Sequence, residues 1–394
     1  MKLSKKNYNC LLLMRVLKQT INIFTDSFLV LYFLQLSNNN ILPVGIFNLF
    51  KYTMIIVTMF TIRNLLKSSK RIFLLRIGVF LNFVFFFLLF IFKEKIINYV
   101  WLLGFVGGLE EGLYFSVFNI YESKIPKDNF AKYSGMYTAL NSLIAVLIPI
   151  IFGSVMSFSG FDKCLIIIFI FVFIKIIISF IYKDVNIPKE DKMNLKKYIS
   201  ILKSNKNVLL SHFVSFSNGL TYSGAFSSLV TVYIIKVFKT GFSLGVLTSV
   251  FALVTSFASF IFAHLIKRKQ YIFLIKTSNF LTIVALIYMI LDCNIYSIIF
   301  FNFIQSFAKT YASLINEGNT MIVSNYDIIK KEYKEEYFLT HELFIYFGRL
   351  ISYTVFCLLA FANNALYVNV IMVVFIMFII YRSIVSILLQ RKND

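Results

Sequence analysis

The chain is divided into twelve apolar runs, each long enough to cross a lipid bilayer as a helix. Only short polar gaps separate most of them, so the pattern predicts an all-α integral membrane protein with twelve transmembrane helices. Of the 394 residues 59% are hydrophobic and only 14% are charged, which is far too apolar for a soluble domain. The runs cover residues 10–36, 41–62, 72–92, 97–121, 131–157 and 162–182, and then 208–235, 241–265, 271–291, 295–322, 337–361 and 365–388.

Lysine and arginine gather in every second gap, and this asymmetry predicts the orientation in the membrane. Cytoplasmic loops retain positive charge during insertion, so both termini and the basic segment 184–207 are expected in the cytoplasm, with the chain as a multi-pass protein of the cell membrane. The formal net charge of +21 does not indicate nucleic-acid binding, because these residues lie in gaps rather than on one face of a soluble fold. The opposite gaps hold only Lys93, Lys95, Lys163, Lys236 and Lys239.

The basic segment 184–207 is the longest polar stretch and divides the chain almost in half. It predicts an N-terminal six-helix bundle at 1–183 and a C-terminal six-helix bundle at 208–394. Within the segment, Leu195, Tyr198, Ile199 and Leu202 recur at helical spacing opposite lysines. This spacing is typical of a helix lying along the inner leaflet, although a solvated linker has the same composition. Both readings stay open at this point.

The helices differ in polarity according to their place in each group of three. The third member, at 72–92, 162–182, 271–291 and 365–388, is the most uniformly apolar. A helix that is apolar on all sides faces lipid, whereas one with a polar stripe faces a cavity or another helix. The first member of each group carries polar residues at mid-depth. We therefore expect four groups of three helices around a polar centre.

The run from Trp101 to Glu122 carries two adjacent acids, Glu110 and Glu111, near its middle. A carboxylate at bilayer mid-depth is costly unless it faces protein or a water-filled cavity, so both acids are functional candidates. Gly104, Gly108 and Gly112 recur every fourth residue and predict the close approach of another helix. Glu110 and Tyr114 share one side of the helix. Adjacent residues point about 100° apart, so only one of the two acids is expected to face a cavity.

Four further runs carry polar stripes at helical spacing. In the first helix the stripe includes Arg15 and Lys18, which either line a cavity or extend to the cytoplasmic surface. Five charged residues are expected at one depth near the bilayer centre: Asp26, Glu110, Glu111, Lys309 and Arg349. These three acids and two bases could neutralise one another across a shared cavity, or could simply hold the helices together. The predicted cavity-lining residues are Asn22, Asp26, Glu110, Glu111, Tyr114, Asn218, Tyr222, Lys309, Asn316 and Arg349.

No pattern in the sequence indicates an enzyme, a cofactor or a metal. The three histidines and the four cysteines are too dispersed for metal-ligand spacing. The nucleotide-binding pattern GxxxxGK[ST] is missing from the sequence, which argues against ATP as the energy source. We expect no cofactor, no metal and no nucleic-acid partner, and a monomer whose partners are the bilayer and a small solute.

The architecture resembles the major facilitator superfamily of secondary transporters, with two halves of six helices and a long basic cytoplasmic link. The segment TIRNLLKSSKRIFLLRIG, Thr61 to Gly78, corresponds to the family's motif between helices two and three and keeps Lys70 and Arg71, but it lacks the aspartate. IPIIFG, with Pro149 and Gly153, is similar to the proline-glycine signature of drug antiporters. EYFLTHELFIYFGR, ending at Arg349, is similar to a branch of bacterial members without an assigned substrate.

The resemblance implies alternating access of a midplane site. The leading hypothesis is transport of a small organic solute coupled to protons, with export favoured over uptake and with Asp26, Glu110 or Glu111 as the protonatable group. Burial disfavours the charged form of a carboxyl group and a nearby base favours it, so its protonation can follow the access state. Anionic solutes would pair with Lys309 and Arg349. The alternative is a transporter-like sensor or assembly factor that has lost transport.

Overall fold

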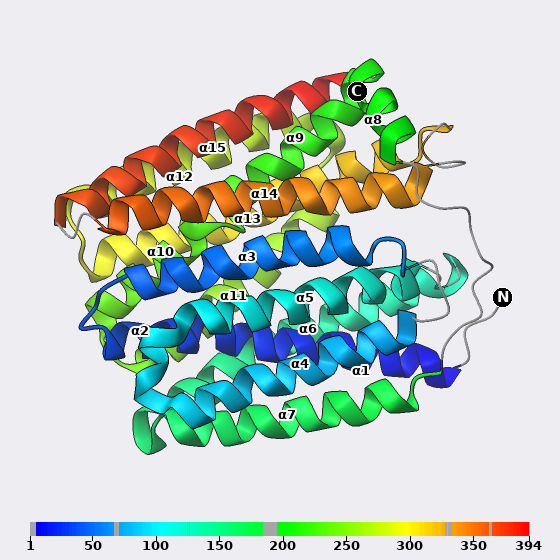
Figure 1. The fold of residues 1–394 in the computed structure, drawn as a ribbon. Helices are drawn as coiled ribbons and strands as arrows, with labels where there is room; N and C mark the ends of the chain where they lie inside the picture. The colour runs from blue at the N-terminus through cyan, green and yellow to red at the C-terminus, as the bar shows by residue number, and fades with distance from the viewer. Residues whose placement is uncertain are drawn as a thin grey trace. The chain divides into compact units, whose positions relative to one another are not determined.

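The structure is a computed structural model that describes residues 5–66, 71–123, 125, 127–183, 195–327, 329, 333–361 and 365–393. Every regular element in these ranges is a helix (Figure 1). Ten helical segments of the described residues are long and apolar enough to cross a membrane. One of them, Arg71–Glu122, holds two predicted helices, α4 (Arg71–Phe92) and α5 (Val100–Ser123), joined by the 3-10 helix η2 (Lys93–Tyr99). The prediction of an all-α integral membrane protein is confirmed.

The chain forms two compact units. Unit 1 comprises Met1–Lys192 and Lys239–Val250, and unit 2 comprises Met193–Phe238 and Phe251–Asp394. The predicted boundary at 184–207 stays a prediction, because residues 184–194 lie outside the described ranges. The grouping differs from equal halves at one place: the beginning of α11 (Gly241–Leu265) belongs with unit 1.

In unit 1 the closest helix pair is α3 (Leu42–Ile62) with α5, which lie side by side in Figure 1. The three glycines of α5 form the contact. A Cβ atom at Gly104 would collide with the carbonyl oxygen of Phe47, and one at Gly108 with that of Lys51. The predicted close approach at the glycine face is therefore confirmed, and α3 is the partner. This packing brings Lys51 of α3 beside the two acids of α5.

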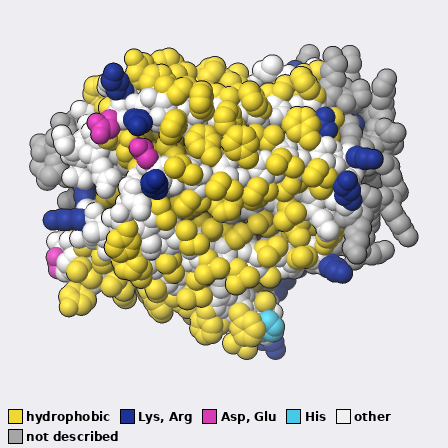
Figure 2. Space-filling view, turned by 90° about the horizontal axis from the view of Figure 1, so that it is seen from below, with side chains coloured by type: hydrophobic (Ala, Val, Ile, Leu, Met, Phe, Trp, Pro, Cys, Tyr) yellow, Lys and Arg dark blue, Asp and Glu magenta, His cyan; other side chains and the backbone are white. Residues whose placement is uncertain are grey.

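The outer helices of unit 1 expose phenylalanine and isoleucine. On α4, Phe73, Phe80 and Phe87 are exposed at a spacing of seven residues, and on α7 (Phe161–Ile181) Phe173 and Ile177 are exposed. Side chains of this kind in a membrane protein contact lipid. Figure 2 shows a broad hydrophobic face of the molecule, with lysine and arginine side chains gathered toward its ends.

The first predicted helix is not continuous. It consists of α1 (Lys5–Ile23), a π-helical turn η1 (Phe24–Phe28) and α2 (Leu29–Leu36). A π-helical turn inside an α-helix is uncommon and is found frequently at functional sites. Asp26 lies in this turn. α1 packs against α7 and against α6 (Lys127–Ser159), whose Gly153 in turn contacts Gly241 at the start of α11.

Unit 2 contains the second interrupted helix. α9 (Lys206–Leu220) and α10 (Ala225–Phe238) are separated by the turn 221–224. α9 packs closely against α14 (Lys334–Phe361): a Cβ at Gly219 would collide with the carbonyl oxygen of Ile345. α9 also packs against α15 (Ala365–Asn393). The unit also contains η3 (Arg268–Gln270), α12 (Tyr271–Leu291) and α13 (Ile295–Ser324).

The described part of the basic segment forms a short helix, α8 (Leu195–Ser204), in unit 2. Its Tyr198 is fully buried in a hydrophobic cluster with Val208 and Tyr337, while Ile199 is exposed. The Tyr198 Oη atom and the His212 Nε2 atom lie 2.6 Å apart at hydrogen-bond distance. Burial raises the pKa of the Tyr198 hydroxyl above its ordinary value, so it stays neutral. The apolar face predicted for the inner leaflet thus packs in part on protein.

Candidate functional site

Five charged side chains lie close together in the interior of unit 1. Two are the predicted acids of α5, and the other three are lysines from three different helices: Lys18 of α1, Lys51 of α3 and Lys175 of α7. Their exposed fractions range from 0% for Lys175 to 9% for Lys51. Burial at this level is unfavourable for a charged group unless it is paired. We refer to Lys18, Lys51, Glu110, Glu111 and Lys175 as the glutamate-lysine cluster.

Glu110 is shared by two lysines. Its Oε2 atom lies 2.6 Å from the Lys18 Nζ atom, and its Oε1 atom lies 3.5 Å from the Lys175 Nζ atom. The Lys175 Nζ atom is also 4.0 Å from the centre of the Tyr114 ring, which provides a cation-π contact. Tyr114 is held in place because its hydroxyl donates a hydrogen bond of 3.1 Å to the Met14 carbonyl oxygen. One carboxylate therefore connects α1, α5 and α7.

Glu111 has a separate partner on the other side of α5. Its Oε2 atom lies 2.6 Å from the Lys51 Nζ atom. Lys51 reaches it because the glycine face of α5 brings α3 within backbone contact at Gly108. The charge of Asp26 also acts on Lys51, from the π-helical turn. The two acids are thus neutralised by different helices.

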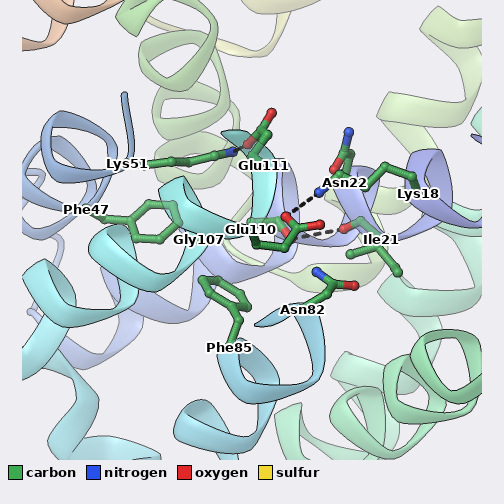
Figure 3. A pocket seen from close by; sticks show the side chains of 11 residues that line it. Lys18, Ile21, Asn22, Phe47, Lys51, Asn82, Phe85, Gly107, Glu110 and Glu111 are labelled. Atoms are coloured by element: carbon green, nitrogen blue, oxygen red, sulfur yellow. Dashed lines mark hydrogen bonds and ion pairs between the residues drawn. The ribbon is translucent and has the colours of Figure 1, made fainter. Parts of the chain in front are cut away.

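A small cavity lies between these ion pairs (Figure 3). Its inner volume is about 20 Å³, which is room for one water molecule and not for an organic solute. The buried Asn82 Oδ1 atom has no hydrogen-bond partner among the described residues, and Asn82 lines the cavity. The full lining is Lys18, Ile21, Asn22, Thr25, Phe47, Lys51, Asn82, Phe85, Gly107, Glu110 and Glu111.

The structure brings together three of the predicted cavity residues: Asn22, Glu110 and Glu111. Both acids reach this small cavity, because it extends across α5 between α1 and α3. Which of them faces the predicted solute cavity stays a prediction. Tyr114 lies one helical turn further along α5 and supports Lys175. Asp26 is exposed on the π-helical turn and does not line the cavity.

The other five predicted residues belong to unit 2. The Asn316 Nδ2 atom lies 3.5 Å from the Asn218 Oδ1 atom, and the Arg349 Nε atom donates a hydrogen bond of 3.3 Å to the Ser223 hydroxyl. Tyr222 lies in the turn 221–224, and Lys309 is exposed on α13. Their predicted cavity shared with Asp26 and Glu110 stays a prediction.

Lys51 and Lys175 were not predicted from the sequence, and the place of Lys18 was undecided. The reading of α7 as lipid-facing on all sides needs correction, because Lys175 of that helix is fully buried against Glu110. The same holds for α15, where Arg382 is 1% exposed. A single basic residue inside an otherwise apolar run is the available signal, since a charge at membrane depth is a functional candidate whatever its sign. Arg15, also undecided, forms an ion pair with Glu122.

These features define a polytopic helical membrane protein with a buried charge cluster. The family model of the Major Facilitator Superfamily matches residues 24–325. The chain belongs to this superfamily.

The chain is similar to known proteins in sequence and in fold. The chain is 24% identical to the uncharacterized protein YqgE of Bacillus subtilis (strain 168) over 342 residues, which is 83% of this chain and 76% of YqgE. The structure is similar to that of a bacterial homologue of the iron transporter ferroportin in its inward-facing state, with a TM-score of 0.67, 12% identity and coverage of 99% and 100% of the two chains. A bacterial homologue of the human lysosomal transporter Spinster gives a TM-score of 0.66, 15% identity and coverage of 100% and 99%. The resemblance to the major facilitator fold is confirmed, and the family supports membrane transport rather than enzymatic activity.

Proposed function

We propose that the protein is a proton-coupled secondary transporter that exports a small organic solute across the cell membrane, and that Glu110 is the group that takes up the proton. One observation carries this proposal: a single buried carboxylate is shared by lysines from two other helices, beside a cavity that admits one water molecule. The cavity has the size for proton delivery through water, and the solute would occupy a different space.

Protonation of Glu110 changes the balance of charge inside unit 1. A proton that arrives through the cavity water binds a Glu110 carboxylate oxygen and removes the negative charge that Lys18 and Lys175 share. Both ammonium groups then lose their counter-charge, which is unfavourable in a buried site. The two ammonium groups can be solvated again only if α1 moves away from α5 or if water enters the site. The π-helical turn η1 follows α1 directly and provides a segment whose hydrogen-bond pattern can change.

The Glu111 pair has a different part in this proposal. Lys51 and Glu111 connect α3 and α5, which are already packed through glycines, so this ion pair holds a rigid helix pair together. Tyr114, Asn22 and Asp26 would support the proton path or the solute, as expected from the sequence. The Lys18 to Glu110 contact is the one that changes between access states.

A flux assay tests the proposal. Proteoliposomes that contain the pH dye pyranine would be screened for solutes whose addition moves protons. The unmodified chain is expected to give solute-dependent proton flux, and Glu110→Gln is expected to abolish it. Asp162→Asn is the matched control, because Asp162 is a surface acid with 58% exposure in a 3.8 Å ion pair with Lys93. Unchanged proton coupling in Glu110→Gln would refute the proposal.

The second candidate function is a transporter-like sensor or assembly factor. The observation that favours it is the lack of an aspartate in the segment Thr61 to Gly78, of which residues 67–70 lie outside the described ranges. A chain without flux for any solute, combined with a co-purifying partner that is lost when residues 189–206 are deleted, would support this alternative. Flux of any solute would exclude it.

A further inference from the structure

Arg382 is a buried cation in unit 2 that differs from the lysines of unit 1. It lies on α15 with 1% of its surface exposed. Its guanidinium carbon is 4.0 Å from the centre of the Tyr222 ring. The Nε and Nη1 atoms are buried without a hydrogen-bond partner among the described residues. The Tyr222 hydroxyl and, one turn along α15, the Ser386 hydroxyl also have no partner there.

Tyr222 belongs to the turn 221–224, where the membrane-spanning segment Lys206–Phe238 is interrupted. Non-helical backbone at membrane depth is tolerated where it is buried in protein or lines a cavity. The adjacent residue, Ser223, accepts a hydrogen bond of 3.3 Å from Arg349 of α14. Guanidinium groups from two helices therefore contact neighbouring residues of one irregular turn.

The positive charge beside this turn indicates a binding site for an anion. In unit 1 each buried lysine of the glutamate-lysine cluster has a carboxylate within 3.5 Å. Arg382 has only an aromatic face as its described partner. A guanidinium presents a planar set of N–H donors that matches the two oxygens of a carboxylate or phosphate. A cation-π contact leaves these in-plane donors available.

We propose that Arg382 and the turn 221–224 form a binding site for the carboxylate or phosphate group of a small solute. The guanidinium N–H groups of Arg382, among them the unpaired Nε donor, bind oxygens of the anion, and the Tyr222 and Ser386 hydroxyls donate further hydrogen bonds. Because Arg382 is enclosed, the anion enters when the turn carrying Tyr222 moves. The assignment of the anion as cargo rests on the proposed transport function, whereas the binding site itself does not. Arg382 thereby takes the role that the sequence suggested for Lys309 and Arg349.

Thermal unfolding of the full chain in detergent tests this site. Inorganic phosphate, acetate and citrate would be titrated at constant ionic strength against chloride, with unfolding followed by the fluorescence of Trp101, the chain's one tryptophan. At least one anion is expected to raise the unfolding temperature in a saturable way. Arg382→Gln is expected to remove this shift, and Arg382→Lys to keep part of it. The matched control is Arg76→Gln, since Arg76 is an arginine of unit 1 with a hydrogen bond to the Ser179 carbonyl oxygen.

Tyr222→Phe keeps the ring under Arg382 and removes one proposed donor, so it tests the site even if Arg382→Gln does not fold. Its half-saturating anion concentration is expected to rise by about tenfold, the effect of one hydrogen bond to a charged group. The absence of any saturable shift in the unmodified chain, or an equal shift in Arg382→Gln, would overturn the proposal.

A comparison of two kinds of nanodisc separates a lipid headgroup from a free solute as the source of the anion. Stabilisation by phosphatidylglycerol nanodiscs over phosphatidylcholine nanodiscs, dependent on Arg382 and without any effect of the free anions, would assign the site to a lipid headgroup and overturn the solute assignment. The proton-coupling proposal fails independently, when Glu110→Gln leaves proton flux unchanged while the anion shift persists. Because the binding assay needs no flux, each failure can be recognised by itself.

Discussion

Glu110 and its two lysine partners predict a ranked set of stabilities for three variants. Glu110→Gln leaves two buried ammonium groups, Lys18 and Lys175, without a carboxylate. Breaking a buried ion pair on one side costs about 3–5 kcal/mol, so we expect the free energy of unfolding to fall by at least this amount. The variant keeps the shape of the side chain, which isolates the loss of charge.

Substitution of Lys18 and substitution of Lys175 should lower the free energy of unfolding by different amounts. At an effective dielectric constant of about 20, gross attraction to Glu110 is about 6 kcal/mol for Lys18 at 2.6 Å and about 5 kcal/mol for Lys175 at 3.5 Å. Lys175→Met leaves the closer ion pair intact and removes an excess cation, so it should cost less than about 1 kcal/mol. Lys18→Met leaves Glu110 with only the longer contact and should fall between the other two variants.

The assay is equilibrium unfolding in mixed micelles with increasing sodium dodecyl sulfate. Trp101 lies on α5, the same helix as Glu110, and is the chain's one tryptophan, so its fluorescence reports on the helix that carries the charge. The expected order of destabilisation is Glu110→Gln, then Lys18→Met, then Lys175→Met. If Lys175→Met were as costly as Glu110→Gln, the account of a carboxylate shared unequally between two lysines would be wrong.

Three further predictions concern other contacts. Lys51→Met and Glu111→Gln should each lower the free energy of unfolding, and the double variant should be at least about 2 kcal/mol more stable than the sum of the two losses, measured as a double-mutant cycle. Purely additive losses would contradict the 2.6 Å ion pair. Gly108→Leu should prevent recovery of folded protein by size-exclusion chromatography, because even its Cβ meets the Lys51 carbonyl oxygen, whereas Gly135→Leu has open space and should fold normally. Tyr198→Phe should reduce stability by about 1 kcal/mol through loss of the hydrogen bond to His212, and should speed tryptic cleavage at the exposed Lys197 and Lys203; an unchanged cleavage rate would argue against docking of α8 on unit 2.

The fold was predictable because membrane helices are specified by length and hydropathy, which are local properties of the chain. The contact between α3 and α5 was predictable in part: glycines at every fourth residue indicate a close helix neighbour, but they do not identify it. The interruptions at 24–28 and 221–224 were not predicted, since neither segment contains a proline, although polar residues stand together in the first and Gly224 ends the second.

The acids of the site were predicted and most of the bases were not. Glu110 and Glu111 are conspicuous because two acids interrupt one apolar run, whereas Lys51 and Lys175 are each the single charge in the middle of theirs. Lys175 is 65 residues from Glu110 in the chain, and no periodicity links two helices that far apart. Arg382 was not predicted for the same reason, since it is a single basic residue in an apolar run. The pairing of charges across helices depends on the packing, and only the structure provides it.

The central claim is that Glu110 takes up the proton, and infrared difference spectroscopy tests it most directly. Acidification of reconstituted protein should produce the carbonyl stretching band of a protonated carboxylic acid. We expect this band in the unmodified chain and in Glu111→Gln, and we expect Glu110→Gln to lose it. The same band in Glu110→Gln, with the same dependence on pH, would show that another group takes up the proton and would contradict the account.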